Sequence, residues 1–240
     1  MIDNEPPVLD ITSTQQNHPA NEENGTPPQA EQAAVASPRY IVVDTEGTGL
    51  FDYKQPADAP GQPRLAEIVM IFIDADLQVE REYHAYIKPD GWEMTPGATA
   101  VNGLTTEFLL ANGVPIAEAL AVYNEAIAEG RVMVAHNQQH DGKQVRAELR
   151  RAEMPDQFES APGICTMRLL TAVCKIPPNG GRGSYKWPKL SEACVFFGLT
   201  EMGDHSAIND AKACLALLRK IRDLGLMPEG RVHYAKNRPE

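Results

Sequence analysis

The chain has 240 residues, of which 42% are hydrophobic and 23% charged, and its formal net charge is −11. This composition is ordinary for a globular protein and excludes a fibrous or fully disordered chain. No run of apolar residues is long enough to cross a membrane, and the first residues lack the basic flank and apolar core of a signal peptide. The four cysteines show no metal-ligand spacing, so we expect reduced thiols in a cytoplasmic protein.

Much of the negative charge lies in the N-terminal segment. Residues 1–38 contain six acidic residues, six of the 19 prolines, no Lys or Arg and no aromatic residue. Such a segment buries too little apolar area to offset the entropy of ordering, so we expect a disordered tail, with a short helix or a partner-binding segment as the alternative. The rest of the chain holds 27 acidic and 22 basic residues, which does not exclude a nucleic-acid partner.

The first half of the remaining chain has the pattern of a strand meander. A β-branched run at 40–44 is bounded by Pro38 and Gly47, and an apolar run at 68–73 and an alternating run at 82–87 follow it. The connections between these runs are short, which favours antiparallel pairing of the three predicted strands.

In the second half, predicted strands alternate with predicted helices. In chain order we expect a helix at 115–129, a buried strand at 132–135, a helix at 142–152, a short strand at 164–166, and helices at 190–197 and 207–224. A meander followed by alternating strands and helices indicates an α/β domain with a mixed sheet flanked by helices.

Two carboxylates stand where the first predicted strand ends. Asp44 and Glu46 are two positions apart, so their side chains point to the same side of a strand and project together beyond the sheet. Like charges held this close are unfavourable unless a cation lies between them. A solvated turn with two incidental acidic residues is the alternative interpretation of this pair alone.

Three further residues with acid–base or metal-binding chemistry occur at predicted element ends. Asp141 precedes a predicted helix and could simply cap it, whereas His205 and Asp210 could be a loop histidine and an acid favoured by the helix dipole. Together, four carboxylates and one histidine at such positions predict a site for hard divalent cations such as Mg²⁺ or Mn²⁺. Paired ions stabilise the attacking and leaving oxygens in phosphoryl chemistry, and a nearby histidine can deprotonate water near neutral pH.

Three ordered motifs resemble those of the DEDDh-type 3′–5′ exonucleases of the DnaQ-like superfamily. They are DTEGTGL at 44–50, AHNQQHD at 135–141 and HSAIND at 205–210. Segments at 100–105 and 190–199 also resemble parts of this family. The chain departs from the family pattern at three positions, where Thr or Ala, His, and an aromatic residue are frequent; these are Gly47, Asn102 and His140. None of the departures falls on the five catalytic positions.

The resemblance implies a fold, a reaction and a domain organisation. The fold would be ribonuclease-H-like, with a single exonuclease domain at 39–228 between the acidic tail at 1–38 and a C-terminal tail at 229–240. The reaction would be the metal-dependent release of nucleoside monophosphates from the 3′ end of DNA or RNA, with two Mg²⁺ or Mn²⁺ ions per site. The resemblance would also allow a polymerase or replication protein as partner.

The resemblance also implies a role for each catalytic residue. Asp44 would bridge both metal ions. Glu46 and Asp210 would complete the first metal site, and Asp141 would serve the second, partly through water. His205 would be the general base that activates the attacking water.

Three more residues would contact the substrate if the resemblance holds. Gly47 would bind the terminal nucleotide through its backbone amide, and Asn137 would be a lesser contact. Leu50 would lie under the terminal base, with a plain core position as the alternative.

A basic segment at 165–191 carries five Lys or Arg residues, with Tyr185 and Trp187 between them, and no acidic residue. Its Pro- and Gly-rich middle predicts a loop. Because basic groups neutralise phosphates and aromatic rings stack on bases, Arg182 and Lys186 are predicted substrate contacts, and single-stranded DNA is the favoured substrate. A solvated loop anchored to the core by Trp187 is the alternative.

Two other functions remain to be weighed against a metal-dependent exonuclease. A non-catalytic nucleic-acid-binding or polymerase-associated subunit would have no need to hold four carboxylates against their repulsion. A phosphohydrolase acting on small phosphates would have no need for the basic segment.

Overall fold

The computed structural model describes residues 39–157, 161–178, 184–199 and 206–228. The predicted tails at 1–38 and 229–240 lie outside the described residues, as do Arg182 and His205. Within the described ranges, no helix is both long and apolar enough to cross a membrane.

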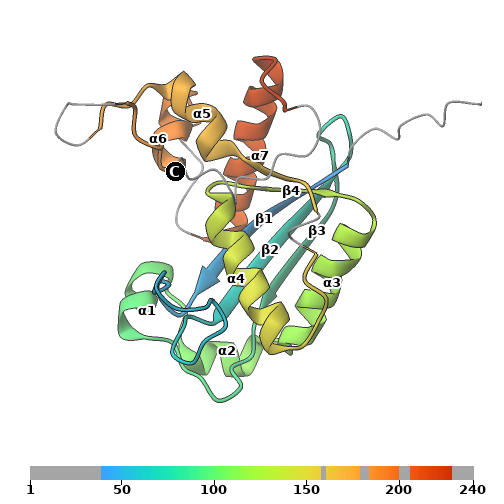
Figure 1. The fold of residues 1–240 in the computed structure, drawn as a ribbon, viewed down its shortest axis with the longest axis vertical. Coiled ribbons are helices and arrows are strands. Elements are labelled where there is room, and N and C mark those ends of the chain that lie inside the picture. Colours follow the sequence, from blue (N-terminus) through green and yellow to red (C-terminus); the bar gives the residue numbers. More distant parts are fainter. Residues whose placement is uncertain (1–38, 158–160, 179–183, 200–205, 229–240) are drawn as a thin grey trace, which may run out of the picture. The chain divides into compact units, whose positions relative to one another are not determined.

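One sheet of five strands, in the order β3-β2-β1-β4-β5, forms the centre of the fold (Figure 1). The strands are β1 (Tyr40–Gly47), β2 (Leu65–Ile73), β3 (Val79–Tyr86), β4 (Val132–Ala135) and β5 (Gly163–Cys165). The first three pair antiparallel, whereas β4 runs parallel to β1 and β5 runs parallel to β4. The predicted mixed sheet and the antiparallel meander are therefore confirmed.

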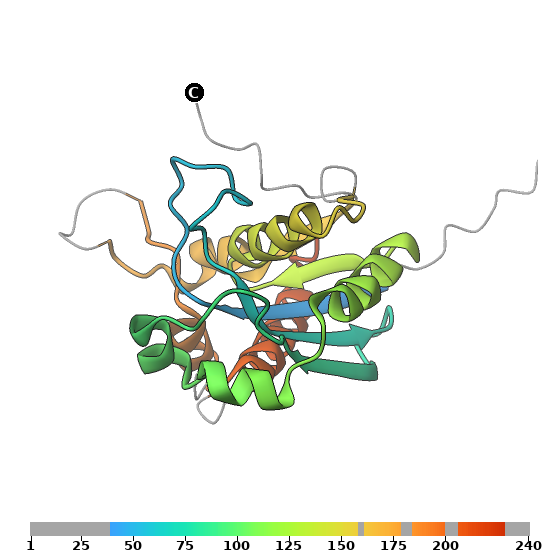
Figure 2. The same ribbon diagram turned by 90° about the horizontal axis from the view of Figure 1, so that it is seen from below.

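Seven helices belong to the described residues, and four of them were predicted. They are α1 (Pro96–Asn102), α2 (Thr106–Asn112), α3 (Ile116–Ala128), α4 (Gln138–Arg151), α5 (Thr166–Cys174), α6 (Leu190–Phe196) and α7 (Ala207–Asp223). Seen along the sheet, α3 and α4 cover one face and α7 covers the other (Figure 2). The prediction for α4 was wrong at its start, which lies at Gln138 rather than at residue 142.

The three helices that the pattern did not predict are short. Helix α1 buries none of its residues and α2 buries only Leu109, so neither carries an apolar periodicity. Both begin at a threonine cap, since the Thr95 and Thr105 hydroxyls accept hydrogen bonds from backbone N–H groups three residues later. Helix α5 occupies the first third of the basic segment, which is therefore not a loop throughout.

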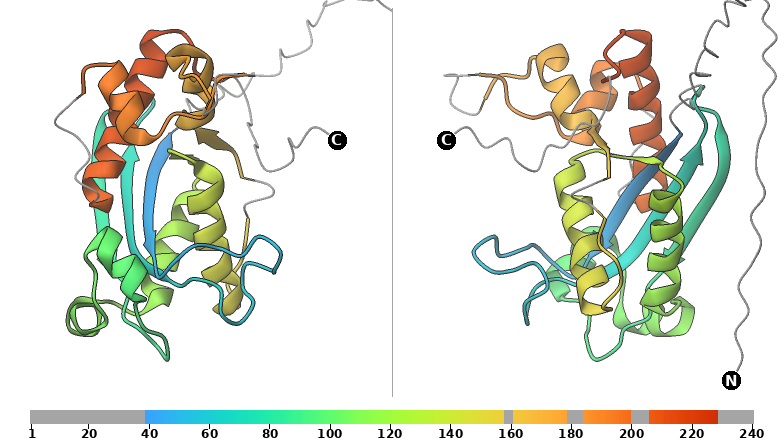
Figure 3. Two further views of the ribbon diagram at one scale, coloured as in Figure 1. Left: turned by 90° about the vertical axis from the view of Figure 1, so that its left-hand side faces the viewer. Right: turned by 45° about the vertical axis from the view of Figure 1, so that its right-hand side comes forward.

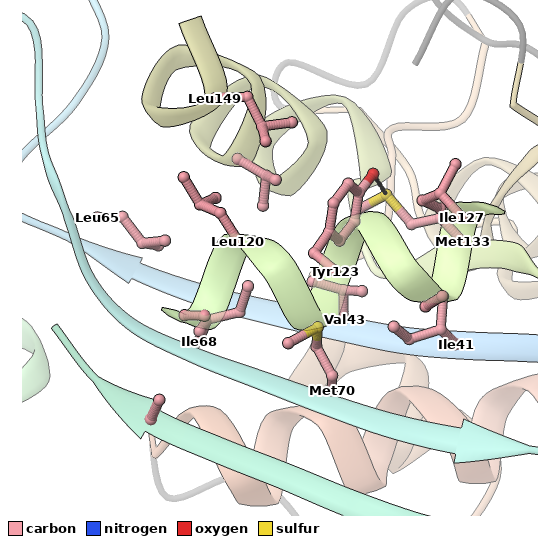
Figure 4. Close-up of a cluster of buried hydrophobic side chains, with 14 of the residues drawn as sticks. Ile41, Val43, Leu65, Ile68, Met70, Leu120, Tyr123, Ile127, Met133 and Leu149 are labelled. Atoms are coloured by element: carbon pink, nitrogen blue, oxygen red, sulfur yellow. Dashed lines mark hydrogen bonds between the residues drawn. The ribbon is translucent and has the colours of Figure 1, made fainter. Parts of the chain in front are cut away.

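Strand alternation divides the core into two parts, one on each face of the sheet. On one face, Ile41 and Val43 of β1 pack with side chains of α3 and α4, and the Tyr123 hydroxyl donates a hydrogen bond to the Met133 sulfur (Figure 4). On the other face, Val42 packs with side chains of α7. The residues that follow Val43 in β1 continue this alternation toward the end of the strand.

A third cluster joins α5 and α6 to α7 (Figure 3). Leu170 and Cys174 of α5 and Cys194 of α6 pack there against Leu217 and Ile221. All four cysteines of the chain are buried and free, as expected of thiols that pack as small apolar groups.

Candidate active site

The end of β1 places Asp44 and Glu46 on the face of the sheet that α7 covers. Both continue the side of β1 on which Val42 packs against α7, and Glu46 pairs in register with Glu67 of β2. The register shifts between Glu46 and Gly47, where the strand leaves the ladder. The two carboxylates therefore project from the sheet where its regular pairing ends.

Gly47 stands at a position where a side chain would be crowded. A Cβ there would lie 3.2 Å from Nε2 of Gln144 and 3.3 Å from the backbone oxygen of Arg64. Few real Cβ contacts are that short. The close packing of Gln144, which is 1% exposed, is thus a structural reason for glycine where the family often has Thr or Ala.

Asp141 enters the site from the opposite side of the sheet. It lies in the first turn of α4 and is only 4% exposed. Thr45, which points to the α4 side of β1, donates a hydrogen bond of 2.8 Å from Oγ1 to Oδ1 of Asp141. Asn137, at a φ of 74°, holds the cap position of α4 instead, so Asp141 is not the helix cap of the alternative interpretation.

Asp210 lies in the first turn of α7, where the sequence predicted it, and its backbone N–H donates to the oxygen of Ser206. His205 precedes the described part of this helix. The described residues of the site therefore include Asp210 but not His205.

The four carboxylates interact electrostatically. Burial, followed by the charges of Asp141, Asp210 and Glu46, holds the pKa of Asp44 well above its usual range. Burial also raises the pKa of Glu46 to about 7, against a hydrogen bond from Asn102 that lowers it. Burial likewise raises the pKa of Asp141 to about 7, against the hydrogen bond from Thr45. Motifs far apart in the sequence thus meet in one electrostatic cluster.

The donor chemistry of this cluster fits a hard divalent cation. Among the described residues, no group of three or more His, Cys, Asp or Glu side chains is placed so that it could hold a metal ion. Asp44, Glu46 and Asp141 nevertheless supply carboxylate oxygens only, and the charge of Asp141 raises the pKa of both Asp44 and Glu46. A bound cation would relieve this repulsion.

Glu67 adds a fifth carboxylate to this region, and the sequence motifs did not include it. It is 4% exposed, and its Oε1 lies 2.6 Å from Nε2 of His84 on β3. Its charge is among those that raise the pKa of Asp44 and Glu46. A charged residue inside the otherwise apolar run of β2 was the sequence signal that could have identified it.

A pocket of about 540 Å³ opens beside the carboxylates. Glu46, Gly47, Leu50, Val101 and Asn102 are among the residues that line it. Leu50 is 89% exposed, which excludes the core position that was its alternative. The Asn102 amide donates hydrogen bonds to Oε2 of Glu46 and to the backbone oxygen of Gly47, at 3.3 Å in both cases. These bonds connect the end of α1 to the end of β1 at the pocket.

The remaining predicted contacts have different surroundings. Asn137 is exposed at the start of α4, consistent with a surface contact. Lys186 forms an ion pair with Glu192, so its charge is already partly neutralised. His136 of the second motif has both ring nitrogens within hydrogen-bond distance of partners, the Thr166 hydroxyl at 2.9 Å and the Pro188 oxygen at 3.0 Å, and is a structural residue.

Comparison with known proteins agrees with this fold and these motifs. A family model described as an exonuclease, RNase T, matches residues 41–218. The DNA polymerase III subunit epsilon of Treponema pallidum (strain Nichols) is 30% identical over 178 residues, which is 74% of each chain.

Solved structures of exonuclease I share the fold. The chain matches E. coli exonuclease I in complex with a dA16 oligonucleotide with a TM-score of 0.64 at 18% identity, over 78% of this chain and 41% of that chain. It matches a moderately thermophilic exonuclease I from Methylocaldum szegediense with a TM-score of 0.63 at 20% identity, over 78% and 40% of the two chains. The chain thus spans about two fifths of the exonuclease I chains. The ribonuclease-H-like fold is confirmed, and the chain belongs to the RNase T family of exonucleases, as a DnaQ-like 3′–5′ exonuclease.

Proposed function

We propose that the protein hydrolyses phosphodiester bonds at the 3′ end of a DNA or RNA strand and releases nucleoside monophosphates, using two divalent metal ions. The observation that carries this proposal is the meeting of Asp44, Glu46, Asp141 and Asp210 in one cluster where β1, α4 and α7 converge. A cluster of repelling carboxylates is costly for a protein that only binds nucleic acid. The non-catalytic alternative is therefore not favoured.

The metal ions, Mg²⁺ or Mn²⁺, would be held by these four carboxylates. We assign Asp44 to both ions, Glu46 and Asp210 to the first ion, and Asp141 to the second. When bound, such ions polarise the scissile phosphate and stabilise both the attacking and the leaving oxygen. Metal dependence is typical of this family.

His205 is proposed as the general base that takes a proton from the attacking water. Its motif position, ahead of the helix that carries Asp210, supports this role. Two of the other histidines have different surroundings, since partners occupy both ring nitrogens of His136 and burial lowers the pKa of His140.

The pocket beside Glu46 is the proposed site for the terminal nucleotide. Gly47 and Leu50 line this pocket, where the Gly47 amide and the exposed Leu50 side chain would meet the sugar and the base. Exonuclease I is bound to single-stranded DNA in one of the solved structures with this fold, and the relative from Treponema pallidum is named as a polymerase subunit. Single-stranded DNA is therefore the first substrate to test, and a polymerase the first partner.

The domain is proposed to span 39–228, with 1–38 and 229–240 as tails. The family model lies wholly within these limits. A chain that lacks residues 1–37 should then degrade a short oligonucleotide at a rate within a few-fold of the full chain.

The decisive experiment follows single-stranded DNA and RNA oligomers that carry a label at the 5′ end. With Mg²⁺ the parent protein should shorten them stepwise from the 3′ end, and EDTA should stop the reaction. Asp44→Asn should abolish shortening and weaken divalent-ion binding in calorimetry. The same substitution at Asp223, an exposed acid at the far end of α7, is the matched control and should change neither. Unchanged metal binding in Asp44→Asn would remove this residue from the site.

A further inference from the structure

Two exposed aromatic rings flank the start of α4, and a cation lies over each. Tyr53 is 65% exposed, and the Lys143 ammonium lies 4.1 Å from its ring centroid. Trp187 is 55% exposed, and the Arg168 guanidinium carbon lies 5.0 Å from its ring centroid. An exposed ring beside a cation offers a stacking surface and a positive charge together, which is what an unpaired base and its phosphate require.

The outer face of α4 connects the two ring–cation pairs. Arg168 donates a hydrogen bond of 3.3 Å to Oε1 of Gln139, and Gln139 precedes Lys143 by four positions. Residues four apart lie on the same face of a helix, one turn from each other. Asp141 and Val145, which belong to the other face, are buried. A continuous surface therefore runs from Trp187 across α4 to Tyr53.

The Tyr53 end of this surface lies next to the pocket proposed for the terminal nucleotide. His140 lines that pocket, and its ring makes an edge contact with Phe51 at 6.1 Å between centroids. Phe51 in turn contacts the Tyr53 ring at 6.5 Å and lies under the Lys143 ammonium at 4.5 Å. These contacts connect the pocket to Tyr53, so a strand whose last nucleotide occupies the pocket could continue along this rim.

We propose that Tyr53, Lys143, Gln139, Arg168 and Trp187 form a binding track for the unpaired nucleotides that precede the 3′-terminal one. This inference rests on the proposed function and specifies its substrate as a single strand, because only unpaired bases expose faces on which the two rings can stack. The cations would neutralise the phosphates between those bases. Among the described residues, the track adds Lys143 and Arg168 to Lys186, whose charge is paired with Glu192.

Binding of labelled oligomers two, four and eight nucleotides long, measured by fluorescence anisotropy, tests the track. Ca²⁺ replaces Mg²⁺ so that the strands stay intact, and DNA and RNA are measured separately. Tyr53→Ala and Trp187→Ala should each weaken binding of the octamer about fivefold or more, the usual loss for a stacked base, and should reduce the gain in affinity with length. Lys143→Gln should lower the slope of log affinity against log salt by about one.

Matched controls separate the track from a general loss of exposed rings or charge. Phe196→Ala removes a ring that is 51% exposed on α6, and Lys220→Gln removes a charge in the last turn of α7; neither should change octamer binding. Far-UV circular dichroism and the unfolding midpoint establish that each variant is folded. A loss on DNA and RNA alike supports stacking on any base, and a loss on one of them identifies the strand that the track binds.

The track is disproved if Tyr53→Ala and Trp187→Ala bind the octamer as tightly as Phe196→Ala does. An equal loss of affinity for a blunt duplex would also disprove it, because a duplex offers no unpaired base faces. If the parent does not shorten strands in Mg²⁺, the proposed function fails, whereas the binding measurement still decides whether the track exists.

Discussion

The hydroxyl of Thr45 donates a hydrogen bond of 2.8 Å to the buried carboxylate of Asp141, a residue 96 positions later in the chain. This bond joins the first motif, at the end of β1, to the second, at the start of α4. It is also one of the hydrogen bonds that orient this buried carboxylate, together with backbone hydrogen bonds from Thr45 and Asp141.

Removal of this hydroxyl should destabilise the fold. Thr45→Val keeps the side-chain shape but leaves the buried Asp141 oxygen without its donor, so we expect a loss of about 1–3 kcal/mol in the free energy of unfolding. Urea unfolding measures this change. Thr45→Ser retains a hydroxyl and is the control. A valine variant as stable as the parent would show that the hydrogen bond is not formed in solution.

The metal-free protein should lose stability as the pH rises. The folded-state pKa of Glu46 and that of Asp141 are about 7, whereas their ordinary values are 4.5 and 3.8. Because the folded state binds these protons more tightly than the unfolded state, their contribution is fully present below about pH 4 and is lost as the pH passes through about 7. Urea unfolding between pH 4 and pH 8 in EDTA should show this decline.

A variant and a metal addition identify the source of the pH effect. Asp141→Asn removes one of the carboxylates with a raised pKa, so the stability of this variant should decline less steeply than that of the parent over this range. Mg²⁺ added at pH 8 should restore stability in the parent, because it binds the ionised carboxylates. Parallel pH profiles for the parent and Asp141→Asn would mean that Asp141 is ionised throughout.

His205→Ala tests the proposed general base. Proton removal by a positioned base contributes about 10²–10⁴-fold, so turnover should fall by that factor while metal and oligonucleotide binding persist. The rate of the parent should rise with pH through the histidine range, and the variant should lack this step. A variant within tenfold of the parent would move the role to another group, and His140, next to Asp141 in the chain, would be tested next.

Glu67 should support metal binding without being a predicted ligand. Its charge adds to the negative potential at Asp44 and Glu46, so Glu67→Gln should weaken Mg²⁺ binding on the order of tenfold, or about 1.4 kcal/mol. The matched control is Glu82→Gln, which removes an exposed charge on the neighbouring strand β3 that is paired with Lys212 of α7. Calorimetry decides between them: equal affinities in both variants would exclude Glu67 from the site.

The ion pair between Lys186 and Glu192 should limit the contribution of the basic segment to binding. Glu192→Gln would release Lys186 from this ion pair. The amide oxygen of the new glutamine could still accept the hydrogen bond from the backbone N–H of Lys189, which caps α6. Oligonucleotide affinity should then increase, and its salt dependence should steepen by up to about one phosphate contact. If both stay as in the parent, Lys186 does not face the substrate and the segment around it is solvated surface.

Local sequence signals were sufficient for much of the fold. The β-branched run of β1, the bounds of β4 at Val132–Ala135 and the apolar spacing of α3 and α7 depend on neighbours in the chain, and the structure confirms them. Short segments that bury little, such as α1, lack the periodicity on which such predictions depend. The three motifs likewise indicated which carboxylates to examine, because the end of a strand and the start of a helix are local features.

The contacts between distant segments were decided only by the tertiary structure. The hydrogen bond from Thr45 to Asp141, the Glu67–His84 pair and the neutralisation of Lys186 by Glu192 each depend on where the chain folds back. The exposure of Leu50 and the cations over Tyr53 and Trp187 are of the same kind. The sequence determined which chemical groups the chain carries, and packing decided which of them are buried, which are paired and which remain open to a substrate, because desolvation and charge pairing are properties of surroundings rather than of residues.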